Sequence, residues 1–325
     1  MTETQATPRF DITSLGEAML RLSVPQGARL DDARQLDVQV AGAEVNVCVA
    51  LARLGRHCSW VGRLPEHALG NLVLRQLRSD GVDVSAVRVA PNERLGTFFI
   101  EFAAEPRAIQ VIYDRADSAA ARMRVADVEW DYLLDTRIVH LTGITAALSE
   151  SCYEIVVEAM RRAREANVLV SFDVNFRAKL WDARAAGERL RPLLADTDVL
   201  FCKSADAARL FDCTGQAQEQ MERLQSLTRA RIVYCTFGAD GAAVLTKDGF
   251  FKLPAIPVHI VDRIGSGDAF AAGALDGILD QDPFLGLKRG LALAAIALSQ
   301  FGDRVLTTRA ELDAVMAQDA REIAR

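Results

Sequence analysis

The segment DRIGSGDAFAAGAL, residues 262–275, places Gly265, Ser266 and Gly267 directly before Asp268 and a run of small residues at helical spacing. Glycine lets the backbone approach a ligand closely, and the first turn of a helix has N–H groups without partners, so this loop could bind phosphate oxygens. Asp268 would then accept the proton of an attacking hydroxyl. The chemistry would be phosphoryl transfer, driven by positioning and fixed dipoles. The simpler interpretation is an aspartate that only complements the helix dipole.

A second glycine loop follows a strand-like run upstream, in TFGADGAAVL. Thr236 ends the run, and the spacing of Gly238 and Gly241 makes a tight loop that can face a nucleotide. The same spacing is typical of a plain β-hairpin turn. Near the start of the chain, AGAEVNVCVALARLG puts Gly42 before a helix that contains Asn46. Polar ligand groups could bind at this helix start, although the apolar pattern of the helix itself predicts core packing.

Polar side chains also follow the buried run VLVSF. In an extended tail Asp173, Asn175 and Arg177 point the same way, and Arg177 could clamp a carboxylate or a phosphate through two hydrogen bonds. In the run AIQVIYDR, Tyr113 and Arg115 share one face, so they would offer a hydroxyl and a cation if that face meets a crevice. The alternatives are a surface ion pair for Arg177 and ordinary exposed strand residues for the other two.

These residues must be positioned by the elements around them, and apolar strand-like runs alternate with helical runs along the chain. The expected strands, buried on both faces, are residues 59–64, 138–144, 168–174, 199–202 and 232–238. The expected helices include residues 43–55, 69–81 and 149–167. Gly81 would stop the second helix, and Ser149 and Asn167 would cap and end the third. Such alternation predicts a mostly parallel sheet with helices on both faces.

A second group of strands departs from this alternation. It comprises residues 36–40, 96–102 and 108–115, with AAEPR as a turn between the last two. These strands predict a small solvated β-sheet outside the main sheet, formed by segments near residues 30–41 and 95–115. Beside a ligand crevice this sheet would act as a lid. The alternative is an ordinary edge hairpin.

Composition limits the class of protein. The chain has 325 residues and is 50% hydrophobic, enough for a large core in one α/β domain or in a domain with a subdomain. A net charge of −6 and a pI near 5.4 argue against a nucleic-acid surface but leave small anionic ligands open. The six cysteines lack CxxC pairs, which predicts buried thiols in a reducing compartment. The polar start MTETQATPRF has no signal-peptide core and no run approaches a membrane span, so we expect a soluble cytoplasmic protein without a membrane partner.

Taken together, these segments resemble the PfkB (ribokinase-like) carbohydrate kinases over nearly the whole chain. Residues 41–73 match the first signature of that family, and residues 262–275 match the second, which usually has the pattern D-T-x-G-A-G-D. The resemblance implies a single kinase domain over residues 1–325, with a ribokinase-like three-layer α/β/α architecture and a small β-sheet lid. It also implies ATP-dependent phosphorylation of a sugar hydroxyl, with Asp268 as base and Gly265, Ser266 and Gly267 in the anion hole.

Within the family, the segments GAEVNVCVALARLG, IYDR, HLTGITAALS and SFDVNFRAKLW are similar to kinases of 2-keto-3-deoxygluconate, which they convert to its 6-phosphate. On that likeness, the residues that would line the sugar acid are Gly42, Tyr113, Arg115, Ile144 and Arg177. Phe99 would stand where such kinases carry tyrosine, with the loss of one hydroxyl contact. Arg115 and Arg177 suit a sugar acid because a neutral sugar would leave a buried cation unpaired.

On the nucleotide side, the resemblance implies ATP contacts from Lys203, Thr236, Gly238, Gly241, Gly265 and Gly267. The sequence departs from the family here, because Lys203 begins the stretch KSAD where many members have N-x-x-E. Asp206 could still organise Mg²⁺ through water. Arg263 and Ser266 replace the usual Thr and Ala, and the apolar helix at residues 291–303 lacks an Asn but suits an adenine wall.

Other functions fit the same resemblance. One is a family kinase for a neutral sugar or a nucleoside, such as a fructokinase, a ribokinase or an adenosine kinase. Another is a non-catalytic sugar-binding relative. Lids in this family often meet across dimers, so a homo-oligomer is also compatible with the sequence.

Overall fold

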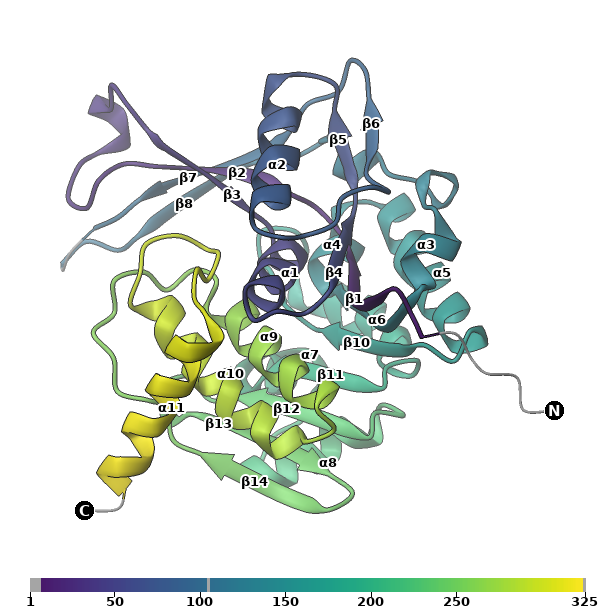
Figure 1. Cartoon of the computed structure of the whole chain (residues 1–325), viewed down its shortest axis with the longest axis vertical. Helices are drawn as coiled ribbons and strands as arrows, with labels where there is room; N and C mark the ends of the chain where they lie inside the picture. The colour runs from purple at the N-terminus through teal and green to yellow at the C-terminus, as the bar shows by residue number, and fades with distance from the viewer. Residues whose placement is uncertain (1–6, 104–105, 324–325) are drawn as a thin grey trace.

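The main sheet of the computed structural model has eight strands in the order β14-β13-β12-β11-β10-β9-β1-β4 (Figure 1). The structure describes residues 7–103 and 106–323, so the polar residues 1–6 lie outside the described part of the chain. Neighbouring strands pair in parallel along the part β12-β11-β10-β9-β1-β4 of this order, and β13 and β14 add an antiparallel edge. Their bounds are β1 Phe10–Leu15, β4 Cys58–Val61, β9 Thr136–Thr142, β10 Leu169–Asp173, β11 Val199–Lys203, β12 Ile232–Thr236, β13 Ala242–Thr246 and β14 Gly249–Leu253.

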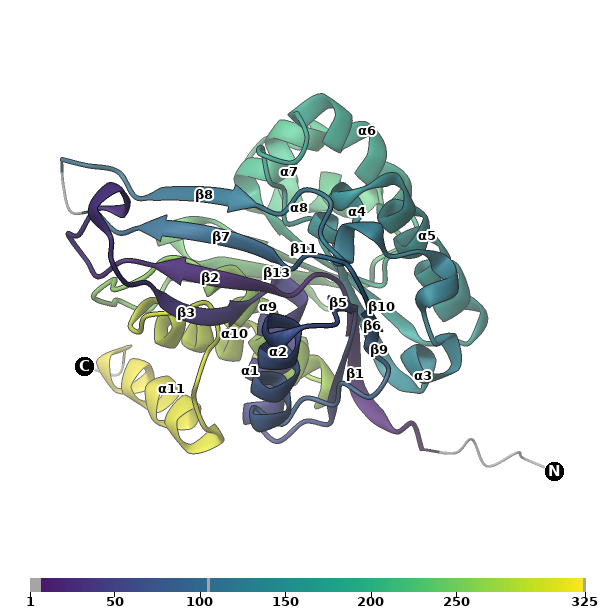
Figure 2. The same cartoon turned by 90° about the horizontal axis from the view of Figure 1, so that it is seen from above.

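Helices cover both faces of this sheet, as Figure 2 shows. One layer contains α1 Ala43–Arg53, α2 Ala68–Ser79, α9 Ser266–Leu279, α10 Pro283–Leu298 and α11 Arg309–Ile323. The other contains α3 Trp130–Leu134, α4 Gly143–Leu148, α5 Glu150–Glu165, α6 Ala183–Leu194, α7 Ser204–Phe211 and α8 Ala217–Ser226. Each layer packs its own cluster of buried apolar side chains against the sheet. The prediction of a three-layer α/β/α fold with a mostly parallel sheet is therefore confirmed.

Local sequence explains several of these elements. Helix α5 begins where predicted, because the Ser149 hydroxyl accepts the N–H of Cys152 at 3.1 Å, and Asn167 follows its end in the left-handed conformation at φ 56°. Strand β1 was not predicted, although it lies inside the sheet. Its Thr13 and Ser14 are fully buried and donate to the carbonyls of Leu133 and His140 at 2.6 and 2.8 Å, so polar residues interrupt its apolar pattern.

A second, smaller sheet extends from the main body (Figures 1 and 2). We call it the small sheet, and its strand order is β3-β2-β7-β8. Its strands are β2 Met19–Ser23, β3 Asp37–Ala41, β7 Gly96–Glu101 and β8 Gln110–Asp114; β5 Arg63–Pro65 and β6 Arg88–Ala90 form a separate pair. The strand β2 was missed in the sequence. In the predicted turn AAEPR, residues 104–105 lie outside the described part of the chain.

The cysteine side chains are buried, as the sequence analysis expected. All six cysteines are buried and free. Among the residues that the structure describes, each helix is too short or too polar to cross a bilayer.

Helices α9 and α10 approach each other through glycines. A Cβ atom added at Gly277 would lie 2.2 Å from the backbone nitrogen of Gly286. One added at Gly273 would lie 2.5 Å from the carbonyl carbon of Arg289. Because backbone atoms cannot move aside as a flexible side chain can, the two helices require glycine at these positions. This close contact fixes how α9 packs on α10.

We therefore expect Gly277→Ala to destabilise the fold. Alanine in a helix interior normally stabilises by ~1 kcal/mol relative to glycine, but here overpacking should reverse the sign and cost about 1–3 kcal/mol. Urea unfolding measures the difference. Gly267→Ala is the matched control in the same helix, because its added Cβ would meet nothing within 4 Å and should leave stability equal or slightly higher. A stable Gly277→Ala variant would contradict the packing argument.

Candidate active site

The loop at residues 263–267 leads into α9 and includes its first two residues. Gly265 caps the helix at φ 84°, a left-handed conformation that favours glycine. The N–H of Ala269 is the first to bond back into the helix, to the carbonyl of Gly265 at 2.9 Å. The N–H groups of Ser266, Gly267 and Asp268 precede it, at the positive end of the helix dipole. This geometry suits the binding of an anion.

Asp268 lies in the first turn of α9 and is buried. Its Oδ2 accepts the amide of Asn46, from α1, at 2.7 Å, and its Oδ1 accepts the amide of Asn175, after β10, at 3.4 Å. Burial raises the pKa of the Asp268 carboxyl, while the amide of Asn46 and the charge of Arg177 oppose this rise. The Oδ1 of Asn46 is buried and has no hydrogen-bond partner among the described residues. The carboxylate is thus a basic group fixed by two amides.

A second carboxyl, Asp173, lies at the end of β10. Its Oδ1 accepts the backbone N–H of Asn175 at 3.0 Å, and Asn175 is held at φ 39°. Burial, together with the negative charge of Asp268, raises the pKa of Asp173 to about 7, although the charges of Lys203 and Arg177 lower it. Asn175 therefore stands between two acids that resist being charged together.

The two predicted cations differ in their partners. Arg115 is buried, and its guanidinium donates to Oε2 of the buried Glu17, with its Nε at 2.8 Å. The other oxygen of Glu17 accepts the hydroxyl of Ser118 at 2.6 Å. In contrast, Arg177 forms no ion pair among residues 7–103 and 106–323. The charge of Arg115 is thus balanced by Glu17, whereas the charge of Arg177 acts at longer range on Asp268 and Asp173.

A cavity of about 1260 Å³ brings most of the predicted site residues together. Those that line it are Gly42, Asn46, Tyr113, Arg115, Ile144, Arg177, Lys203, Thr236, Gly238, Gly241, Gly265, Ser266, Gly267 and Asp268. Gly42 has φ +153°, and a Cβ there would lie 2.3 Å from the carbonyl oxygen of Glu17, so glycine is required at the start of α1.

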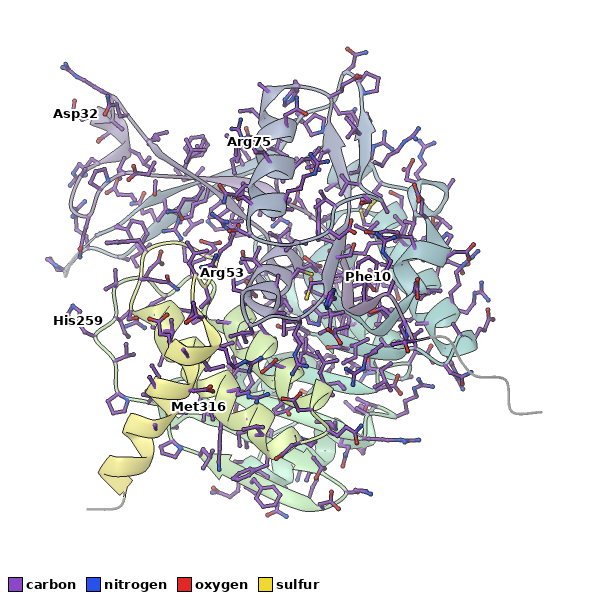
Figure 3. The ribbon with its side chains drawn as sticks, in the orientation of Figure 1. Phe10, Asp32, Arg53, Arg75, His259 and Met316 are labelled. Atoms are coloured by element: carbon purple, nitrogen blue, oxygen red, sulfur yellow. The ribbon has the colours of Figure 1, made fainter. Side chains whose placement is uncertain are left out.

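The cavity has an apolar end beside the glycine loop at residues 238–241. Leu291, Ala294, Ala295 and Leu298 of α10 line it, and the sequence analysis placed an adenine wall on this helix. The segment between β14 and α9 also lines the cavity, which the sequence analysis did not identify. Figure 3 shows His259 pointing outward from this segment, whereas its neighbours Val258 and Ile260 line the cavity.

Two predicted site residues do not line the cavity. Side chains alternate along a strand, and Phe98 lines the cavity while Phe99 does not. Phe98 stacks on Tyr113 with ring centroids 5.5 Å apart, so the aromatic side chain at this part of the cavity is Phe98 and not Phe99. Asp206 is half-buried in α7, one residue beyond Lys203, Ser204 and Ala205, which do line the cavity. Met19 and Asp303 also line it and were missed in the sequence.

The chain is similar to known proteins over nearly its whole length. Residues 9–309 match the pfkB family carbohydrate kinase. A 2-dehydro-3-deoxygalactonokinase of Haloferax volcanii is 35% identical over 94% of this chain and 96% of its own length. A 2-dehydro-3-deoxygluconokinase of Thermoproteus tenax is 32% identical, with 92% and 91% covered. The crystal structure of a 2-dehydro-3-deoxygluconokinase from Thermotoga maritima superposes with a TM-score of 0.89 at 28% identity, covering 95% of this chain and 99% of that one.

Asp173 gives the fold a specific dependence on pH. Its folded-state pKa of about 7 lies above the value near 3.9 of an unfolded aspartate, so the folded chain binds more protons between these values. This group therefore lowers stability progressively as pH rises through that window. Asp173→Asn removes the effect, so its Tm should gain on wild type as pH rises from about 4 to 8. The exposed Asp248→Asn is the control, and a difference at Asp173 that stays constant with pH would contradict the argument.

Proposed function

Because the chain belongs to the PfkB family of carbohydrate kinases, we propose that it transfers the terminal phosphoryl group of ATP to a 2-keto-3-deoxy sugar acid. The substrate would be 2-keto-3-deoxygluconate or its galacto epimer, and the product the 6-phosphate. One observation carries the proposal. The buried base Asp268 and the unpaired cation Arg177 line the same cavity as the N–H groups that begin α9.

The chemistry follows from the position of Asp268. Its carboxylate would take the proton of the attacking hydroxyl while the hydroxyl oxygen bonds to the γ-phosphorus. The bond to the bridging oxygen then breaks, and ADP leaves with the electron pair. The raised pKa makes the carboxylate a stronger base, and the amide of Asn46 keeps its deprotonated form available. The free Oδ1 of Asn46 would accept a second sugar hydroxyl and so orient the acceptor.

The anion hole would act on the charge of the transferred group. The N–H groups of Ser266 and Gly267 lie at the positive end of the α9 dipole. Because these donors are fixed in place, they need no reorganisation during the reaction. Adenine would lie against the apolar α10 wall, with Gly238 and Gly241 near the ribose and phosphates. Lys203, exposed at the end of β11, would meet the phosphate chain.

Mg²⁺ belongs to this proposal through the nucleotide. The described residues contain no group of three or more His, Cys, Asp and Glu side chains that could hold a metal by themselves. In phosphoryl-transfer sites Mg²⁺ is held by one or two carboxylates together with water and phosphate oxygens, so these residues fit an ion that arrives with ATP. Asp206, which lies one residue beyond the cavity lining, would reach such an ion only through an intervening water. The ion would neutralise charge between the phosphates.

The sugar acid is favoured by the state of the two arginines. Glu17 already balances Arg115, so Arg115 would offer its remaining N–H groups without a net charge. Arg177 keeps its full charge for a carboxylate. The relatives described above are named for substrates that carry such a carboxylate.

The small sheet would close over this sugar, since Met19, Phe98 and Tyr113 of this sheet line the cavity. The six buried free thiols support a cytoplasmic setting.

Asp268→Asn tests the base. The variant should fold normally, because burial already disfavours the charged carboxylate. We expect kcat to fall roughly 10²- to 10⁴-fold with little change in the Kd of either substrate. Steady-state kinetics by ADP release, with calorimetric binding, measure both quantities. A kcat near wild type would remove Asp268 as the base.

Arg177→Ala tests the substrate class on a panel of 2-keto-3-deoxygluconate, its galacto epimer, gluconate, fructose and ribose. Loss of a charged hydrogen bond, worth about 1.5–3 kcal/mol, should raise KM for the keto-deoxy acids by roughly ten- to hundredfold and leave turnover of neutral sugars unchanged. The exposed Arg184→Ala, from the surface pair with Glu188, is the control. Wild-type turnover of a neutral sugar in preference to the acids would keep the kinase and exclude the sugar-acid substrate.

A further inference from the structure

Arg21 is a buried charge that does not line the cavity of the proposed carboxylate clamp. It lies in the middle of β2 with 1% of its surface exposed. One terminal nitrogen of its guanidinium donates to Asp262 Oδ2 and the other to Asp303 Oδ1. Its central carbon lies 5.1 Å from the ring centre of Phe102, which covers the group on one side. The guanidinium therefore joins the small sheet to two acids of the main body.

Both acids contact the loop that leads to α9. The Oδ1 of Asp262 accepts the N–H of Ile264 at 3.0 Å, and its Oδ2 also accepts the N–H of Gly302 at 3.2 Å. The backbone of Asp303 presses against Gly265, where an added Cβ would lie 2.2 Å from the carbonyl oxygen of Asp303. The start of the loop and the surface on which Gly265 packs are thus held by one guanidinium.

Stability does not explain this cluster. Two carboxylates share a single cation in a buried site, and burial raises the pKa of Asp303 to about 6, with the charges of Asp268 and Asp262 adding to the rise. Buried ion clusters of this kind are often no more stable than apolar residues of the same volume. What a planar guanidinium supplies instead is direction, because it fixes two carboxylates at defined angles.

We infer that Arg21 is a positioning residue for phosphoryl transfer, which holds the loop at residues 263–267 in the geometry that its N–H groups need to meet the transferred phosphoryl group. The inference rests on the proposed function of that loop. Arg21 does not line the cavity and touches no reacting atom. It acts through Asp262 and Asp303. Because Met19 of the same strand lines the cavity, Arg21 also connects the small sheet to the loop at residues 263–267.

The experiment compares Arg21→Ala and Arg21→Lys with wild type. A displacement of about 1 Å in an anion hole can cost 10²-fold, so we expect kcat to fall roughly ten- to hundredfold in Arg21→Ala while KM for ATP and for the sugar changes little. Arg21→Lys keeps the charge but not the planar donor pair and should recover only part of the loss. Guanidinium ion at a non-denaturing concentration should restore activity to Arg21→Ala, and urea, which is planar but uncharged, should not.

Arg56→Ala is the matched control. Arg56 is mostly buried and binds Asp276 and Asp280 toward the other end of α9, away from the cavity. It should lose stability without the selective loss of kcat. If Arg21→Ala does not fold, Arg21→Met combined with Asp303→Asn removes the cation and one carboxylate together, and the same fall in kcat is expected. A kcat near wild type in the folded variants, or a fall equal to that of Arg56→Ala, would overturn the inference.

Hydrogen–deuterium exchange separates this inference from the proposed function. Exchange in peptides that cover residues 262–268 should be faster in both Arg21 variants than in wild type and in Arg56→Ala. This readout needs no substrate. Absence of sugar-acid turnover in wild type would refute the proposed substrate alone, whereas unchanged exchange in the loop would refute the role of Arg21 whatever the substrate is.

Discussion

The site depends on keeping a carboxylate at the start of a helix without letting it occupy the N–H groups there. Asp268 is held by the amides of Asn46 and Asn175 at 2.7 and 3.4 Å. These amides come from α1 and from the end of β10, so three segments distant in sequence must meet at one point. The glycine contact between α9 and α10 holds α9, and with it Asp268, against the neighbouring helix. Packing in the helix layer thus sets the geometry of an acid at its edge.

The charges around this point are not balanced by the protein alone. Asp173, Asp268 and Asp303 all have pKa values raised by burial, while Arg177 and Lys203 face the cavity. Two anionic ligands entering the cavity would bring negative charge beside these acids, and only free cations can offset it. Arg115 is bound to Glu17, whereas Arg177 has no ion-pair partner among the described residues. An arginine can attract an anion strongly only if the protein has not already neutralised it.

Sequence alone was enough where local chemistry decides structure, and it failed where distant contacts do. The glycine loop before Asp268 and the caps of α5 follow from backbone preferences that a few neighbouring residues express. The strands β1 and β2 were missed because buried Thr13, Ser14 and Arg21 interrupt their apolar patterns, and the partners that permit this burial lie far along the chain. Phe98 and Phe99 are adjacent aromatics, and only strand register decides which of them faces the cavity.

The connection between the two sheets shows how these observations belong together. Residues 16–21 pass from β1 to β2 and carry two buried charges, Glu17 and Arg21. Glu17 binds Arg115 directly after β8, and Arg21 binds Asp262 and Asp303, which contact the loop at residues 263–267. An apolar contact tolerates sliding, but a buried ion pair loses its stabilisation once its geometry is broken. Any movement of the small sheet on the main body, closure over a ligand included, would therefore move both Arg115 and the loop before Asp268, because one short segment of chain carries both ion-paired residues.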